Sequence, residues 1–167
     1  MSTKALRLCL VAGFLASLPL AAAAKSFTIP DPGAIAVVTL PDDWTNTEIA
    51  KGVESTSDDD AVYVAVEVTD LKDVSKAVAD TIVWLKSKDV VIDQSTKKQG
   101  DITINGMTGV QVKWDGKDED GPTHVSLTVL QVTDAKGLIL TYWASPEGEK
   151  DNLKELGSII DSLKQVK

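Results

Sequence analysis

The sequence is nearly devoid of the side chains that form disulfides, thiol nucleophiles and zinc sites. It contains one cysteine, Cys9, and one histidine, His124. Because Cys9 lies in an N-terminal apolar run with the character of a signal peptide, the mature chain is expected to have no cysteine. A single histidine without cysteine does not make a usual zinc site. The core alone must therefore hold the fold.

The N-terminal segment has the composition of a secretory signal peptide. Lys4 and Arg7 precede an apolar run over residues 8–20, which is too short for a membrane span of about 20 residues. Ala22 and Ala24 then occupy the positions that signal peptidase reads. We therefore predict that residues 1–24 are removed, and that the mature protein is periplasmic or secreted and has no transmembrane segment.

The chain also lacks a basic patch. Its formal net charge is −8, and removal of the signal peptide with Lys4 and Arg7 takes this to about −10. An acidic surface repels nucleic acids and anionic lipids, so neither is expected as a partner. Residues 25–167 provide enough chain for a single domain with one sizeable core.

Most of the mature chain shows the period of β-strands. The alternation is clearest at 61–68, where valines at even positions oppose Tyr63, Ala65 and Glu67. Turn sequences such as NGMTG, residues 105–109, join consecutive strands and favour antiparallel pairing. Further strands are predicted at 34–41, 45–57, 100–104, 109–115, 123–133 and 137–145.

Two segments show the helical period instead. The first is residues 73–90, with Asp70 or Asp73 as the predicted cap. The second begins at Ser145, a favourable N-cap that is followed by Pro146. The predicted buried stripe is Val74, Ala77, Val78, Thr81, Ile82 and Leu85 in the first helix, and Leu153, Leu156, Ile160 and Leu163 in the second. We therefore predict an α+β domain with a largely antiparallel central sheet covered by amphipathic helices.

Three stretches resemble the PsbP-like fold family, which includes PsbP and bacterial envelope proteins of the DcrB type. They are LPDDW at Leu40–Trp44, ITINGMTGVQV at Ile102–Val112, and LKELGSIIDSLK at Leu153–Lys164. The resemblance implies an α/β sandwich that serves as a binding or assembly subunit and not as a catalyst. Unlike the DcrB type, this sequence has no lipidation cysteine after the signal peptide, which favours a soluble periplasmic form.

The acidic stretch WDGKDEDGPTH, Trp114–His124, has the composition of a hairpin turn. An EF-hand calcium loop does not fit, because placing Gly121 at position six puts Gly116 at one and Leu127 at twelve. A second acidic run, SDDDA, precedes the strand at 61–68 and is interpreted as a solvated loop. Weak calcium binding is the alternative for both segments, through Asp58, Asp59, Asp60, Asp115, Asp118 and Asp120.

No catalytic constellation is present in the sequence. Strand alternation places His124 beside Ser126 on the polar face, near the acidic turn that contains Asp120. These residues could be combined into a Ser–His–Asp set, but there is no nucleophile elbow such as G-x-S-x-G. A phosphate-binding glycine loop is missing as well, since a strand and not a helix follows the glycines near 105. We predict that the protein is not an enzyme and needs no cofactor.

Two adjacent aromatic residues are candidates for contact with a protein partner. Tyr142 and Trp143 point to opposite faces of their strand, so one of them is expected to be exposed. Together with the resemblance and the signal peptide, this favours a non-catalytic binding or assembly protein that contacts another envelope protein.

Overall fold

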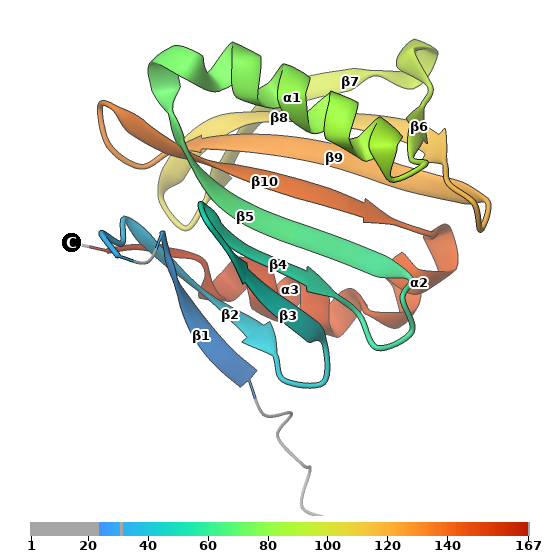
Figure 1. The fold of residues 1–167 in the computed structure, drawn as a ribbon, viewed down its shortest axis with the longest axis horizontal. Coiled ribbons are helices and arrows are strands. Elements are labelled where there is room, and N and C mark those ends of the chain that lie inside the picture. The colour runs from blue at the N-terminus through green and yellow to red at the C-terminus, as the bar shows by residue number, and fades with distance from the viewer. Residues whose placement is uncertain (1–23, 31, 167) are drawn as a thin grey trace, which may run out of the picture.

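An eight-stranded antiparallel sheet forms the centre of the computed structural model, which describes residues 24–30 and 32–166 (Figure 1). The strand order is β3-β4-β5-β10-β9-β8-β6, and β7 also pairs with β8. The strands are β3 (Thr45–Ile49), β4 (Gly52–Thr56), β5 (Val62–Asp70), β6 (Val91–Ile92), β7 (Lys98–Ile104), β8 (Met107–Lys117), β9 (Pro122–Gln131) and β10 (Lys136–Ala144). The predicted α+β class with a largely antiparallel sheet is confirmed. The predicted signal peptide lies, except for Ala24, outside the described residues.

The two faces of the central sheet are covered by different elements. Helix α1 crosses one face, whereas a small sheet and the C-terminal helices cover the other (Figure 1). The small sheet has the order β1-β2-β11. The elements are α1 (Val74–Ser87), β1 (Ala24–Ile29), β2 (Ala36–Pro41), β11 (Lys164–Gln165), α2 (Pro146–Asp151) and α3 (Leu153–Ser162), and two 3-10 turns, η1 (Leu71–Asp73) and η2 (Gln94–Thr96). No helix in the described part of the chain is long and apolar enough to cross a membrane.

Side-chain alternation along β5 creates a core on each face of the sheet. Its valines enter the larger core, on the side of the small sheet and α3, while Tyr63 points toward α1. The larger core includes Phe27, Ile29, Val38, Leu40, Val62, Val64, Val66, Leu130, Leu138, Ile159 and Leu163, and the smaller core consists of Leu85, Val90, Trp114, Val125 and Leu127. The predicted orientation of β5 and of the α1 stripe is therefore confirmed.

Several predicted local features are wrong. The segment 45–57 forms two strands and not one, because residues 50 and 51 make a tight turn between β3 and β4. Neither predicted cap of α1 forms a side-chain cap hydrogen bond. Asp70 instead pairs with Lys136, at 2.7 Å between Oδ1 and Nζ, which links the start of the helix region to β10.

The buried stripe of the C-terminal helix also differs from the prediction. The chain turns at Asn152, between α2 and α3, so the two short helices do not share one continuous stripe. Ile159 and Leu163 are buried, whereas the side chains of Leu153 and Ile160 are 66% and 38% exposed. Two large apolar residues predicted to be buried are therefore on the surface.

Gly109 shows how closely two strands approach in the central sheet. A Cβ atom at this position would lie 1.9 Å from the carbonyl oxygen of Val129. We expect Gly109→Ala to lower the free energy of unfolding by about 1–3 kcal/mol, because backbone atoms must move to relieve the overlap. Gly100→Ala is the matched control, since nothing lies within 4 Å of its Cβ position. Urea denaturation of both variants checks this, and equal stability of the two would contradict it.

Candidate functional site

The acidic stretch between Trp114 and His124 is the turn of the β8–β9 hairpin, as predicted. Its strands pair up to Lys117 and Pro122. The Asp118 carboxylate accepts hydrogen bonds from the backbone N–H groups of Asp120 and Gly121, both at 3.1 Å. This carboxylate therefore stabilises its own turn.

In the second acidic run, the carboxylate of Asp59 forms hydrogen bonds that support the fold. The Ser57 hydroxyl donates a hydrogen bond to Asp59, and the Asn152 side-chain amide donates another at 3.2 Å. The Ser57 bond is the main cause that holds the pKa of Asp59 below its usual value. Asp58 and Asp60 are exposed beside it. Asp59 thus connects the β4–β5 turn to the junction of α2 and α3.

The structure does not gather the six candidate calcium ligands into one site. Asp58, Asp59 and Asp60 lie in the β4–β5 turn, and the other three lie in or beside the β8–β9 hairpin turn. Among the described residues, no group of three or more His, Cys, Asp or Glu side chains is placed to hold a metal ion. Calcium binding at these positions stays a prediction.

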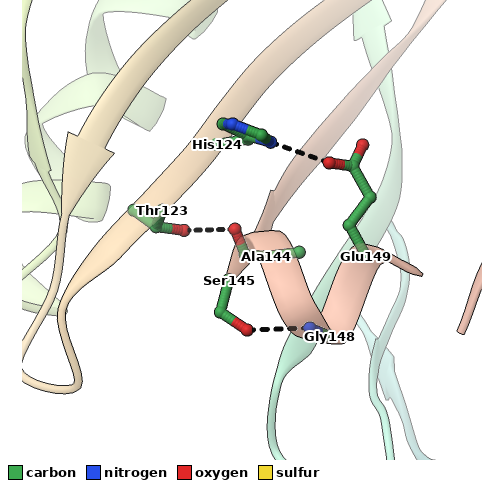
Figure 2. Close-up of polar contacts among 6 residues, drawn as sticks. All are labelled: Thr123, His124, Ala144, Ser145, Gly148 and Glu149. Carbon is green, nitrogen blue, oxygen red and sulfur yellow. Dashed lines mark hydrogen bonds and ion pairs between the residues drawn. The ribbon is translucent and has the colours of Figure 1, made fainter. Parts of the chain in front are cut away.

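His124 belongs to the contact between β9 and α2 (Figure 2). Its Nδ1 lies 2.7 Å from Oε2 of Glu149, in the first turn of α2. Thr123 donates a hydrogen bond to the carbonyl of Ala144, and the Ser145 hydroxyl accepts one from the N–H of Gly148 at 3.0 Å. The predicted N-cap at Ser145 is confirmed. These contacts fix α2 against the sheet.

A groove of about 630 Å³ lies beside this contact, between α3 and the sheet face formed by β8, β9 and β10. We call it the α3 groove. Apolar side chains dominate its helical side, and both polar and apolar side chains line the strands. The apolar residues include Ile104, Leu140, Leu153, Leu156, Ile159 and Ile160, and the polar ones include Lys98, Gln111, Lys113, Ser126, Thr128 and Tyr142. Clefts of this size and character are typical of binding sites.

Two lysines at one side of the α3 groove are direct cross-strand neighbours. Lys98 of β7 pairs in register with Lys113 of β8. Like charges in this arrangement destabilise a sheet by a few tenths of a kcal/mol or more. Among the described residues, neither lysine forms an ion pair within 4 Å. The two lysines are the positive charges of a groove whose lining also includes Asp115, Glu149 and Asp161.

The two aromatic residues proposed for partner contact, Tyr142 and Trp143, lie on opposite faces of the central sheet. Tyr142 lines the α3 groove, and its hydroxyl is buried with no hydrogen-bond partner among the described residues. Burial, together with the nearby charge of Glu149, raises the pKa of Tyr142. Trp143 points toward α1 and stacks on Tyr63, with ring centroids 4.0 Å apart. Both aromatic residues are half-buried, and only Tyr142 lines the groove.

Comparison with solved structures places the fold among the PsbP-like proteins. The chain is similar to the cyanobacterial PsbP of Synechocystis sp. PCC 6803, with a TM-score of 0.58 and 10% identity over 92% of this chain and 98% of that one. It is also similar to LpqN, a Mycobacterium tuberculosis protein involved in cell envelope biogenesis, with a TM-score of 0.54 and 14% identity over 86% and 92% of the two chains. The chain therefore has the PsbP-like fold that its sequence resembles.

A third similar structure, from Bacteroides thetaiotaomicron, has a TM-score of 0.56 and 16% identity. The match covers 86% of this chain and 48% of that one, so the fold recurs within a longer chain. No protein-family model and no curated protein matches the sequence. At 10%, 14% and 16% identity, these comparisons establish the fold alone. A function for this chain has to be inferred from its own residues.

The role of Asp59 in the β4–β5 turn can be tested by removing the charge of its carboxylate. A carboxylate whose pKa is lower in the folded state stabilises the fold above its unfolded pKa, and this contribution is lost as the pH falls through the folded value. We expect Asp59→Asn to lower the free energy of unfolding by about 0.5 kcal/mol at pH 7, because solvent screens this exposed carboxylate, and by less at pH 3.5. Asp58→Asn, at the neighbouring exposed position, is the control and should have little effect. Urea denaturation at the two pH values measures both, and equal losses in the two variants would contradict a specific role.

Proposed function

We propose that this protein is a non-catalytic binding or assembly protein of the cell envelope, exported to the periplasm, that docks another envelope protein in the α3 groove. The main support is the position of Leu153 and Ile160, two exposed apolar residues beside a groove of about 630 Å³. Exposed apolar side chains next to a concave surface are typical of sites that bind protein partners.

The other groove residues define the chemistry of the partner. The apolar side of α3 suits an apolar side chain of the partner, and the ring of Tyr142 adds to this lining. Lys98 and Lys113 suit a carboxylate. We therefore propose that the partner inserts an amphipathic segment carrying at least one acidic residue.

Binding without catalysis is consistent with the polar residues in the groove. His124 contacts Glu149 on α2, while Ser126, on the same strand, is a cross-strand neighbour of Tyr142. No hydrogen bond joins His124 to Ser126 among the described residues, so the pair lacks the contact that activates a nucleophile.

The partner can be located by photo-crosslinking in cells. A photoreactive residue replaces Gly157, which lines the groove and has no atom within 4 Å of its Cβ position. The control carries the same residue at Val83, which is 71% exposed on α1, on the opposite side of the sheet. We expect one reproducible adduct from position 157 and none from position 83. The same adducts from both positions, or none from either, would contradict docking in the groove.

Substitutions in the groove should weaken this adduct without unfolding the protein. We expect Leu153→Glu to reduce its yield at least tenfold, because a charge replaces an apolar contact, whereas Val83→Glu should leave it unchanged. Reversing both groove lysines to glutamate should reduce the yield as well, and Lys72→Glu is the charge control. Circular dichroism and thermal unfolding verify that each variant is folded. An adduct that all variants retain would place the partner elsewhere.

A further inference from the structure

A second concave site lies on the opposite face of the central sheet, independent of the groove. A cavity of about 650 Å³ opens between α1 and the strands β4, β5 and β10, and we call it the α1 cavity. Its lining includes Glu54, Tyr63, Glu67, Trp84 and Thr141. Its volume is in the range of sites for small organic molecules.

Two carboxylates lie close together on the strand side of this cavity. Glu54 of β4 pairs in register with Ala65, two residues before Glu67 on β5, so the two carboxylates are diagonal neighbours on one face. The Tyr63 hydroxyl donates a hydrogen bond to Oε2 of Glu54 at 2.8 Å. Burial raises the pKa of Glu67, and the charge of Glu54 adds to this effect while Lys51 opposes it. The fold therefore holds two acidic groups together at a partly desolvated position.

Three lysines line the cavity against five carboxylates, so its lining keeps an excess of negative charge. Lys136 forms an ion pair with Asp70, and Lys76 forms one with Asp80, both at the edge of the cavity. Lys51 also lines the cavity, but no ion pair within 4 Å joins it to a carboxylate among the described residues. Lys76 and Lys136 are thus paired with aspartates, and Lys51 is the lysine whose charge acts on Glu67.

Aromatic rings complete the lining near the carboxylates. The centroids of Tyr63 and Trp84 are 5.4 Å apart, and both residues border the cavity. The Trp84 ring already attracts one cation of the chain itself, since Nζ of Lys88 lies 5.8 Å from its centroid. Because the Tyr63 ring is stacked on Trp143, Trp84 supplies the aromatic face beside the carboxylates. An aromatic face beside carboxylates is the combination that recognises alkylammonium groups.

One buried polar group in the floor of the cavity has no partner. Thr141 lies on β10 beside Ala65, with 1% of its surface exposed, and its hydroxyl makes no hydrogen bond to any described residue. An unsatisfied buried hydroxyl is unfavourable unless something else compensates for it. A polar ligand atom in the cavity would provide that compensation if the floor relaxed slightly.

We propose that the α1 cavity binds an organic ammonium ion, with Glu54 and Glu67 facing its charge, Tyr63 orienting Glu54, and Trp84 contacting its alkyl groups. A divalent metal ion fits less well, because it needs several oxygen ligands. The described residues place no three His, Cys, Asp or Glu side chains to hold one. The two carboxylates and the aromatic wall instead match a larger ion of lower charge density.

The test uses choline and 1,4-diaminobutane as probes and 3,3-dimethyl-1-butanol as the neutral counterpart of choline. Calorimetric titration measures the affinity, and NMR amide shifts show the location. We expect at least one of the ammonium probes to bind and to shift residues 63–67 and 139–141, while the alcohol does not bind. Glu67→Gln should weaken binding at least tenfold, whereas Asp101→Asn, at an exposed carboxylate on β7, should leave it unchanged.

Trp84→Leu is a second variant, which keeps both carboxylates and should also weaken binding. The proposal is overturned if neither ammonium probe binds, if the alcohol binds as tightly as choline, or if Asp101→Asn weakens binding as much as Glu67→Gln. Tighter binding of Ca²⁺ with displacement of the probe would identify a metal site instead. None of these results depends on the α3 groove, so they leave the docking proposal unaffected.

Discussion

The pairing of β5 with β10 is the constraint on which the rest of the molecule depends. These two strands lie at the centre of the sheet and pair along the whole of β10, from Lys136 opposite Asp70 to Ala144 opposite Val62. Their side chains alternate between the two faces of the sheet, so each strand contributes residues to the packing on both faces. A shift of one residue in this register would turn the core side chains of one strand to the wrong face and disturb both cores.

The site on the α3 side depends on a chain of short polar contacts at the start of α2. Ser145 caps this helix, Thr123 bonds to the carbonyl before it, and His124 contacts Glu149 (Figure 2). Asn152 then joins the end of α2 to Asp59 in the β4–β5 turn. These contacts hold α2 and its junction with α3 against the sheet, while Asn105 and Ser162 hold the C-terminal end of α3. Leu153 and Ile160 lie on this helix beside the groove.

Local rules in the sequence were sufficient for features that depend on neighbouring residues. Alternation predicted the faces of β5, helical spacing predicted the inner side of α1, and Ser145 with Pro146 predicted the start of α2. Asn105 and Gly106 have positive φ values of 50° and 87°, as expected for the turn there. Each of these features is determined by steric or capping effects within a few residues.

Features that depend on distant residues were not predictable in this way. The small sheet requires a two-residue strand, β11, to pair with β2, more than a hundred residues earlier in the chain. The Lys98–Lys113 pair follows only from the register of β7 with β8, and the neighbourhood of Glu54 and Glu67 follows from the register of β4 with β5. Spacing in the sequence indicated the strands but contained no information on which side chains would meet across them. Both candidate sites therefore depend on which side chains the strand register brings together.

The polar outer strands of the central sheet have a consequence for how this protein can associate. At one margin, β3 exposes Thr45, Thr47 and Glu48, and Glu48 forms an ion pair with Lys25. At the other margin, β7 exposes Lys98, Asp101 and Thr103, and the apolar strand beside it, β6, is only two residues long. Charged and polar side chains on an outer strand discourage another chain from extending the sheet. Self-assembly into a continuous ribbon is thereby opposed even at high local concentration, and the broad faces are left as the surfaces through which other molecules can be recognised.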